Sequence, residues 1–276
     1  MHTWRKNTAV WKCGGTLYLS VPFTWLLSDA EALAADHKGK VVAGGPAVDL
    51  MGASWADETP KHIPFDVLAM HNPCATFTTR GCPNNCQFCA VPKLEGPLRE
   101  LPEWKPAPII CDNNLLAASK KHFEQVIQSL KPFPACDFNQ GLDARLFTKW
   151  HADQIAKLRN PMVRFALDHD ASEDPVAKAV EIARKAGLRQ FGVYVLIGFK
   201  DTPQNALRRL RAVQKLKIRP NPQRYQPLDA IKKNAYVEKA WTETELRRMM
   251  KYFARLRWFE GIPYEDFRPP DQMTLF

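Results

Sequence analysis

Residues 78–91, TTRGCPNNCQFCAV, hold three cysteines in a loop that a glycine and a proline open. The spacing of Cys82, Cys86 and Cys89 is C-x3-C-x2-C, and the aromatic Phe88 precedes the last of them. Three thiolates this close in sequence can wrap one face of an iron–sulfur cluster, and a cubane usually takes four. A loop that supplies only three therefore leaves one iron open to another ligand.

A structural zinc site is the alternative for this stretch. Such a site usually combines two separated pairs of ligands into a four-coordinate set. Here there is one triplet and no second pair at that spacing, although His71 and Cys74 lie nearby in the sequence. The chain has 7 cysteines with no paired framework, which favours reduced thiols and a cytoplasmic location over disulfides. The pattern thus predicts a cluster with an open iron.

The three-cysteine spacing and its aromatic resemble the motif of radical S-adenosylmethionine (radical SAM) enzymes. The resemblance implies a 4Fe–4S cluster on Cys82, Cys86 and Cys89 and S-adenosylmethionine (SAM) on the open iron. An electron from the cluster would cleave SAM to methionine and a 5′-deoxyadenosyl radical. A reductant such as flavodoxin or ferredoxin would supply that electron.

The fold expected from the pattern is α/β, with three segments. Residues 71–230 alternate strand and helix six times, which predicts a partial (β/α)6 TIM-like barrel with its chemistry at the carboxyl ends of the strands. The expected strands are ATFTTR, PIICDNN, ACDFNQGLDARL with its exit loop, MVRFALDHD, FGVYVLIGF and the irregular IRPNPQRYQPLD. Residues 1–70 predict a short α/β segment and residues 231–276 a basic helical extension.

The N-terminal segment resembles the end of the cobalamin-binding domain of some radical SAM enzymes. A strand, a helix and a second strand run into Gly44-Gly45-Pro46. The D-x-H-x-x-G motif that would place a histidine on cobalt is absent from the sequence, and the segment is short for a doubly wound sheet. We therefore expect a structural remnant and no cobalamin.

The resemblance also implies SAM contacts after the second and third barrel strands. Asp112, Asn113 and Asn114 stand where the family places polar groups near the methionine part of SAM. Gln140 and Arg145 belong to QGLDAR, which resembles an arginine-containing motif of the cobalamin-associated branch. The planar fork of Arg145 suits the SAM carboxylate. A helix cap for Asp112 and turn roles for the two asparagines are the alternatives.

The fourth and fifth strands carry the remaining candidates. Asp168 takes the place of the family's ribose-binding glutamate, and Gly198 the place of the glycine that lets the backbone approach adenine. His169 and Tyr225 are candidate groups on the substrate side, beside Arg145 and Asp168 as candidate catalytic residues. An ion pair or helix cap is the alternative for Asp168, a turn glycine for Gly198, and a structural role for His169 and Tyr225.

Positive charge is concentrated in the C-terminal part of the chain. The formal net charge is +10, and residues 200–276 hold 17 basic and 9 acidic residues. The last five residues, Gln272–Phe276 (QMTLF), resemble the pentapeptide by which bacterial replication and repair proteins bind the DNA sliding clamp, with Met273 in place of leucine. These features favour a nucleic acid partner. A solvated basic face is the alternative.

The function predicted from the sequence is a radical SAM enzyme that abstracts hydrogen from a substrate, with nucleic acid or a nucleotide favoured. Modification of a peptide or small metabolite is one alternative. A cluster-bearing binding or sensor protein that does not cleave SAM is another. The sequence holds no apolar run of membrane-spanning length, and its first residues lack the pattern of a signal peptide. We therefore expect no membrane association.

Overall fold

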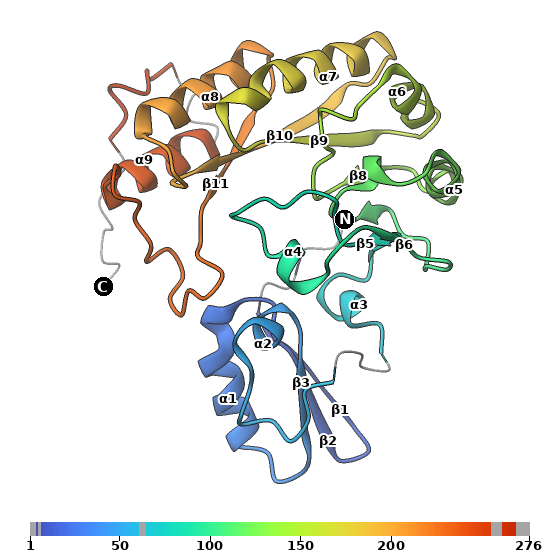
Figure 1. Ribbon diagram of the computed structural model, residues 1–276, viewed down its shortest axis with the longest axis vertical. Coiled ribbons are helices and arrows are strands. Elements are labelled where there is room, and N and C mark those ends of the chain that lie inside the picture. The colour runs from blue at the N-terminus through green and yellow to red at the C-terminus, as the bar shows by residue number, and fades with distance from the viewer. Residues whose placement is uncertain (1–3, 5–6, 61–64, 255–260, 269–276) are drawn as a thin grey trace. The chain divides into compact units, whose positions relative to one another are not determined.

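The computed structural model (Figure 1) describes the following parts of the chain: residue 4 and residues 7–60, 65–254 and 261–268. The chain forms two compact units. Unit 1 comprises Met1–Asn113 and Gln226–Tyr236, and unit 2 comprises Asn114–Tyr225 and Val237–Phe276.

Unit 1 begins with a three-stranded sheet of order β1-β2-β3. Its first helices and strands are β1 (Ala9–Cys13), β2 (Thr16–Ser20), the 3-10 helix η1 (Thr24–Leu26), α1 (Leu27–Ala35), β3 (Val41–Gly44) and α2 (Pro46–Met51). Strands β2 and β3 are parallel, with α1 as the connection between them. Figure 1 shows α1 beside this sheet, and a buried apolar cluster joins them through Leu19, Ala30 and Ala43.

Strand β1 was not foreseen from the sequence, where the expected α/β segment starts at the second strand. It pairs antiparallel with β2 across a two-residue turn at Gly14 and Gly15. Both glycines have positive φ, +55° and +79°, which residues with a Cβ rarely adopt. A Gly-Gly pair between two β-prone runs is a hairpin signal, so this strand could be found from the sequence.

The cysteine-bearing part of unit 1 has only short elements. They are α3 (Val67–His71), β4 (Ala75–Thr76), β5 (Thr79–Arg80), α4 (Val91–Leu94), β6 (Arg99–Glu100) and β7 (Ile109–Ile110). The strand expected over ATFTTR is therefore divided in two. β4 pairs parallel with β7, whereas β5 pairs antiparallel with β6 in a separate two-stranded sheet.

Unit 2 alternates long strands and helices. Its elements are η2 (Leu115–Ala117), α5 (Lys120–Leu130), β8 (Cys136–Phe138), α6 (Lys149–Ile155), β9 (Pro161–Leu167), η3 (Asp170–Ser172), α7 (Glu173–Lys185), β10 (Gln190–Ile197), α8 (Pro203–Lys215), β11 (Pro220–Arg224) and α9 (Glu243–Ala254). The pairs β8–β9, β9–β10 and β10–β11 are all parallel. In Figure 1, α7 and α8 lie along one face of β9 and β10.

The burial pattern of β9 shows how the sequence produces this layer. Val163, Phe165 and Leu167 are buried, while the residues between them are half-buried. Side chains alternate between the faces of a strand, so one face of β9 is apolar and packs under helices. The other face of the same strand carries Arg164, and Asp168 directly follows the strand.

The main sheet has six strands in the order β11-β10-β9-β8-β7-β4, the reverse of their order in the chain. The expected α/β class is therefore confirmed, with a largely parallel sheet. The two strands at the ends of this order are β11 and β4.

Within residue 4 and residues 7–60, 65–254 and 261–268, none of the helices has the length and apolar character needed to cross a bilayer.

Candidate functional site

The cysteine loop lies between β5 and α4 in unit 1. Cys82, Cys86 and Cys89 are all half-buried. The loop is held at its start by the amide of Cys82, which donates to the carbonyl of Gly96 at 3.1 Å. It is turned at its end by the amide of Cys89, which donates to the carbonyl of Cys86 at 3.0 Å. The loop thus keeps its sulfur atoms within reach of an exogenous group.

Two backbone amides are directed at the sulfur atoms of this loop. The amide of Asn84 donates to Sγ of Cys82 at 3.4 Å, and the amide of Val91 donates to Sγ of Cys89 at 3.5 Å. An N–H donor stabilises the negative charge of a thiolate, and hydrogen bonds to the sulfurs are among the factors that set cluster potentials. The donor set and its hydrogen bonds therefore fit an iron–sulfur cluster.

Among the described residues, no three or more His, Cys, Asp or Glu side chains are gathered so as to hold a metal ion. A single ion draws all its ligands to one point, whereas a cubane takes each thiolate at a different iron. The described residues thus form no single-ion site of this kind.

Gly81 and Glu95 hold the start of the cysteine loop. Gly81 has φ +76°, and a Cβ at this position would overlap the backbone carbonyl of Pro97. The Glu95 carboxylate accepts from the amide of Gly81 at 2.7 Å, from the Arg80 guanidinium at 2.8 Å and from the Asn113 side chain at 2.9 Å. Sequence reasoning missed Glu95, which is not among the predicted site residues.

The structure places Asp112 against the strand that enters the loop. Its buried carboxylate accepts from the amide of Thr78 at 2.6 Å, from the Thr78 hydroxyl, and from the amide of Thr79 at 3.0 Å. Asp112 thus orders the backbone before Gly81. Unit 1 holds the predicted SAM contacts Asp112 and Asn113, and the motif aromatic Phe88, which is half-buried within the loop.

Unit 2 gathers several of the predicted residues at the ends of its strands. Asp143 accepts from the guanidinium of Arg145 at 2.8 and 2.6 Å, and it also accepts from the Asn114 amide at 3.4 Å. Asp168 interacts electrostatically with Arg145, Asp143 and His169. Four predicted residues, Asn114, Arg145, Asp168 and His169, are therefore neighbours, and Asp143 is an additional member that sequence reasoning quoted but did not assign.

Asp168 stands out in this group because of its environment. Burial raises the pKa of its carboxyl group, and the nearby charges of His169, Arg209 and Arg145 oppose that rise. No hydrogen bond joins its carboxylate to another residue in the described part of the chain. A desolvated carboxylate without donors is a suitable acceptor for hydroxyl groups of a ligand.

Gly198 lies in a turn that a buried network holds. It has φ +76°, and its amide donates to Asp201 at 3.1 Å. The same carboxylate accepts from Arg209 at 2.5 Å and from the indole of Trp241 at 2.9 Å. Arg209 also donates to the carbonyl of Leu196 at 2.8 Å, so the end of β10 is fixed from both sides.

The remaining predicted residues have more peripheral positions. Gln140 is exposed, just before Gly141 with φ +91°. The His169 ring lies 3.3 Å from the hydroxyl of Ser172. The Tyr225 ring is tilted against Phe199, with centroids 4.7 Å apart. Gln272–Phe276, the clamp-like peptide, lies outside the described residues.

A row of polar side chains on the sheet of unit 2 was not predicted from the sequence. Arg164 donates from Nε and Nη2 to the two carboxylate oxygens of Asp137, both at 2.7 Å. Asp137 is buried on β8 and Arg164 lies on β9 next to it. The hydroxyl of Tyr194, on β10, donates to the carbonyl of Asn139 at 2.8 Å. These residues form a polar row on the face of the sheet opposite Val163 and its buried neighbours.

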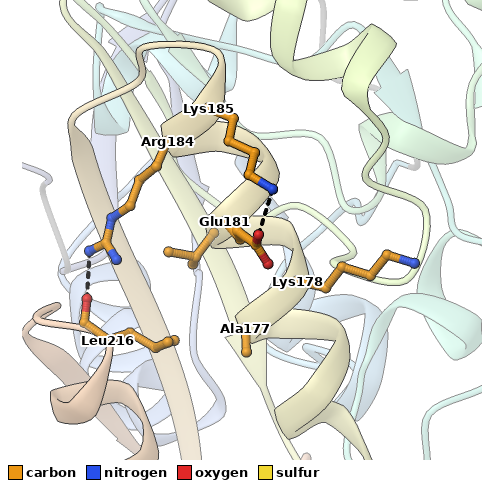
Figure 2. Close-up of a pocket in the computed structure, with 7 residues that line it drawn as sticks. Ala177, Lys178, Glu181, Arg184, Lys185 and Leu216 are labelled. Carbon is orange, nitrogen blue, oxygen red and sulfur yellow. Dashed lines mark hydrogen bonds and ion pairs between the residues drawn. The ribbon is translucent and has the colours of Figure 1, made fainter.

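A surface depression of about 610 Å³ lies on α7 of unit 2 (Figure 2). Its lining residues are Ala177, Lys178, Val180, Glu181, Arg184, Lys185 and Leu216, none of which is a predicted site residue. Figure 2 shows Arg184 reaching the carbonyl of Leu216 at 2.5 Å and Lys185 paired with Glu181 at 2.6 Å. Both cations are thus engaged within the chain, and we assign no ligand to this depression.

Comparison with known protein families matches no family model to the chain, and no curated protein matches its sequence. The fold and the site alone define the class. This is an α/β protein with a largely parallel six-stranded sheet, a three-thiol loop in unit 1 and a group of charged side chains at strand ends in unit 2.

Proposed function

We propose that this chain is a radical SAM enzyme with a 4Fe–4S cluster on Cys82, Cys86 and Cys89. The observation that carries the proposal is the loop itself, in which three half-buried thiols are spaced C-x3-C-x2-C and two amides are directed at sulfur. When bound, the cluster supplies the electron that cleaves SAM to methionine and the 5′-deoxyadenosyl radical that abstracts hydrogen from substrate. Three protein thiolates leave one iron available for SAM.

The proposal assigns the nucleoside of SAM to the strand ends of unit 2. The carboxylate of Asp168 accepts from the ribose hydroxyls, which gives it the donors that its surroundings in unit 2 do not supply. Gly198, with its positive φ, lets adenine approach the backbone. Gln140 and Tyr225 border the same ends of the strands.

The methionine part of SAM is assigned to polar groups after the second and third strands. Arg145 is more than half exposed, with 53% of its side chain accessible, so it has room to pair with the SAM carboxylate. The guanidinium of Arg145 would then be shared between Asp143 and the SAM carboxylate. Asn113 and Asn114 supply polar side chains after the second strand, and Asp112 acts on the loop backbone in support of the cysteines.

We also propose that the six-stranded sheet forms the partial (β/α)6 barrel of this family. The chain order of its strands supports the proposal, because each parallel strand follows the preceding one across the sheet. Helices α7 and α8 connect successive parallel strands in the same way.

A polyanionic substrate, nucleic acid or nucleotide, is the substrate class that we propose. The net charge of +10 and the basic C-terminal part of the chain support it. Binding of a labelled oligonucleotide should weaken steeply as salt rises from about 50 to 200 mM. Binding that does not depend on salt would favour a peptide or a neutral metabolite.

The test of the main proposal is anaerobic reconstitution with iron and sulfide, followed by dithionite and SAM. 5′-Deoxyadenosine is measured by mass spectrometry. The wild type should bind about four irons and produce deoxyadenosine. Cys86→Ala should lose both. Cys13→Ala is the matched control, because Cys13 is an exposed thiol outside the motif, and it should behave as the wild type.

The other outcomes of this experiment separate the alternatives. A bound cluster with no deoxyadenosine, with or without an oligonucleotide, would overturn the enzymatic proposal in favour of a sensor. Iron binding that is equal in wild type and Cys86→Ala would overturn the cluster assignment. Zinc bound in place of iron would return the loop to the structural-site alternative.

A further inference from the structure

We propose that Glu95 is a positioning residue that orders the cysteine loop and, as half of an ion pair with Arg80, sets the reduction potential of the cluster. The inference rests on the proposed function for its second half. Its first half, the ordering of the loop, applies to the chain without a cluster.

The contacts of Glu95 converge on the residues that precede Cys82. Its two carboxylate oxygens are divided between the Arg80 guanidinium at 2.8 Å and the Gly81 amide at 2.7 Å. The next residue, Gly96, accepts from the amide of Cys82 at 3.1 Å. Residues 95 and 96 therefore hold three consecutive positions, 80 to 82, from one side.

Glu95 also ties the loop to the end of β7. The Asn113 side chain donates to the same oxygen that the Gly81 amide occupies, at 2.9 Å. Only 15% of the Glu95 side chain is exposed, so its charge is poorly screened by water. Removing a half-buried acceptor with three donors is costly, since it takes a partner from each of the three donors.

Arg80 balances this charge next to the cysteine motif. Its guanidinium lies 4.0 Å above the Phe77 ring and 30% of its side chain is exposed. A reduced cluster carries one more negative charge than an oxidised one. A nearby negative side chain therefore lowers the potential and a nearby positive one raises it, so the two members of the pair act in opposite directions.

The first experiment measures loop order in the protein without iron. Alkylation of Cys82, Cys86 and Cys89 is followed by mass spectrometry, with the exposed Cys13 as internal reference. In the Glu95→Gln variant, the three loop cysteines should be alkylated severalfold faster, relative to Cys13, than in the wild type. The reason is that the loop opens more often. Glu103→Gln, at an exposed glutamate of the same unit, is the control and should match the wild type.

The second experiment measures the reduction potential of reconstituted protein by EPR-monitored titration. Glu95→Gln should shift the potential to more positive values, and Arg80→Gln should shift it to more negative values. Glu95→Asp keeps the charge but is one methylene shorter, so it should loosen the loop while changing the potential little. Opposite signs for the two neutral variants would not arise from structural damage alone.

The results that overturn the inference differ from those that overturn the proposed function. Unchanged alkylation in Glu95→Gln would show that Glu95 does not order the loop, with or without a cluster. Shifts of the same sign in Glu95→Gln and Arg80→Gln would remove its role in the potential. A wild type that binds no cluster would instead overturn the proposed function, and the alkylation result would still decide the positioning role.

Discussion

Gly81 combines a backbone conformation and a neighbour that each exclude other residues. Its φ of +76° disfavours any residue with a Cβ, and a Cβ here would overlap the carbonyl of Pro97. Gly96 has a similar φ of +70° but open space around it. Alanine at Gly96 would therefore carry only the cost of the left-handed backbone. Alanine at Gly81 would carry that cost and the steric overlap as well.

We predict that Gly81→Ala is much more harmful than Gly96→Ala. Gly96→Ala should lower the free energy of unfolding by about 1 kcal/mol, the cost of the left-handed conformation alone. Gly81→Ala should lose about 1–3 kcal/mol more through overpacking, together with most of its iron. Urea unfolding of the iron-free protein and iron content after reconstitution measure both effects. Equal losses in the two variants would contradict the steric argument.

Asp168 provides a prediction with a defined pH dependence. Because burial raises its pKa, the folded protein binds this proton more tightly than the unfolded chain does. The free energy of unfolding should therefore fall as pH rises from the ordinary pKa of an aspartate through the raised one. Asp168→Asn should remove that fall and be the more stable protein at neutral pH. Unfolding measured at several pH values checks this, with the exposed Asp174→Asn as control.

The same variant should bind SAM less tightly if Asp168 holds the ribose. Losing a hydrogen bond to a charged group costs about 1.5–3 kcal/mol, which is about tenfold or more in Kd. Calorimetry with the reconstituted protein measures the affinity. An unchanged Kd would assign Asp168 a purely structural role.

Single functional residues can be predicted from the sequence where their spacing alone identifies them. Cys82, Cys86 and Cys89 are identified by their spacing alone. Glu95 and Asp143 are not, because their roles depend on partners that only the folded chain brings near them. The contacts of Glu95, for example, come from residues 14 to 18 positions away.

Among the elements, the amphipathic helices were the most predictable. The i, i+3, i+4, i+7 spacing of Phe123, Val126, Ile127 and Leu130 predicts an amphipathic helix, and these apolar side chains of α5 are buried. Ser119 caps this helix. Thr202 likewise caps α8. These signals are local, since a cap and its acceptor lie within one turn of each other. The division of residues 75–80 between β4 and β5 was not predictable, because the partners of these strands lie farther along the chain.

The Asp137–Arg164 ion pair joins two adjacent strands on the polar face of the sheet. Its contribution to the free energy of unfolding can be measured by substitution. Only 6% of the Asp137 side chain and 22% of the Arg164 side chain are exposed. Asp137→Asn should lower the free energy of unfolding by about 1.5–3 kcal/mol, because it breaks a bidentate charged pair. Asp153→Asn breaks the exposed Lys149–Asp153 pair and should cost less than about 0.5 kcal/mol. Chemical unfolding compares them, and equal losses would contradict the assigned burial.

For the whole molecule, the terminal peptide Gln272–Phe276 gives a prediction from sequence alone. Leu275→Ala combined with Phe276→Ala should abolish binding to a bacterial sliding clamp, since it removes both apolar anchors. Met273→Leu should tighten binding, because it restores the residue usual at that position. Surface plasmon resonance at micromolar concentrations measures all three proteins. An intact chain that does not bind the clamp would contradict the motif assignment.

One hydrogen bond within unit 1 joins residues that are synthesised far apart in time. The hydroxyl of Thr24, which is 5% exposed, donates to the carbonyl of Ala230 at 2.5 Å. These residues are 206 positions apart, and the segment Asn114–Tyr225 of unit 2 lies between the two parts of unit 1. A nascent chain on the ribosome would thus expose its cysteine loop long before unit 1 is complete. Cotranslational loading of iron would then meet a partly folded site, whereas post-translational loading would meet a finished one.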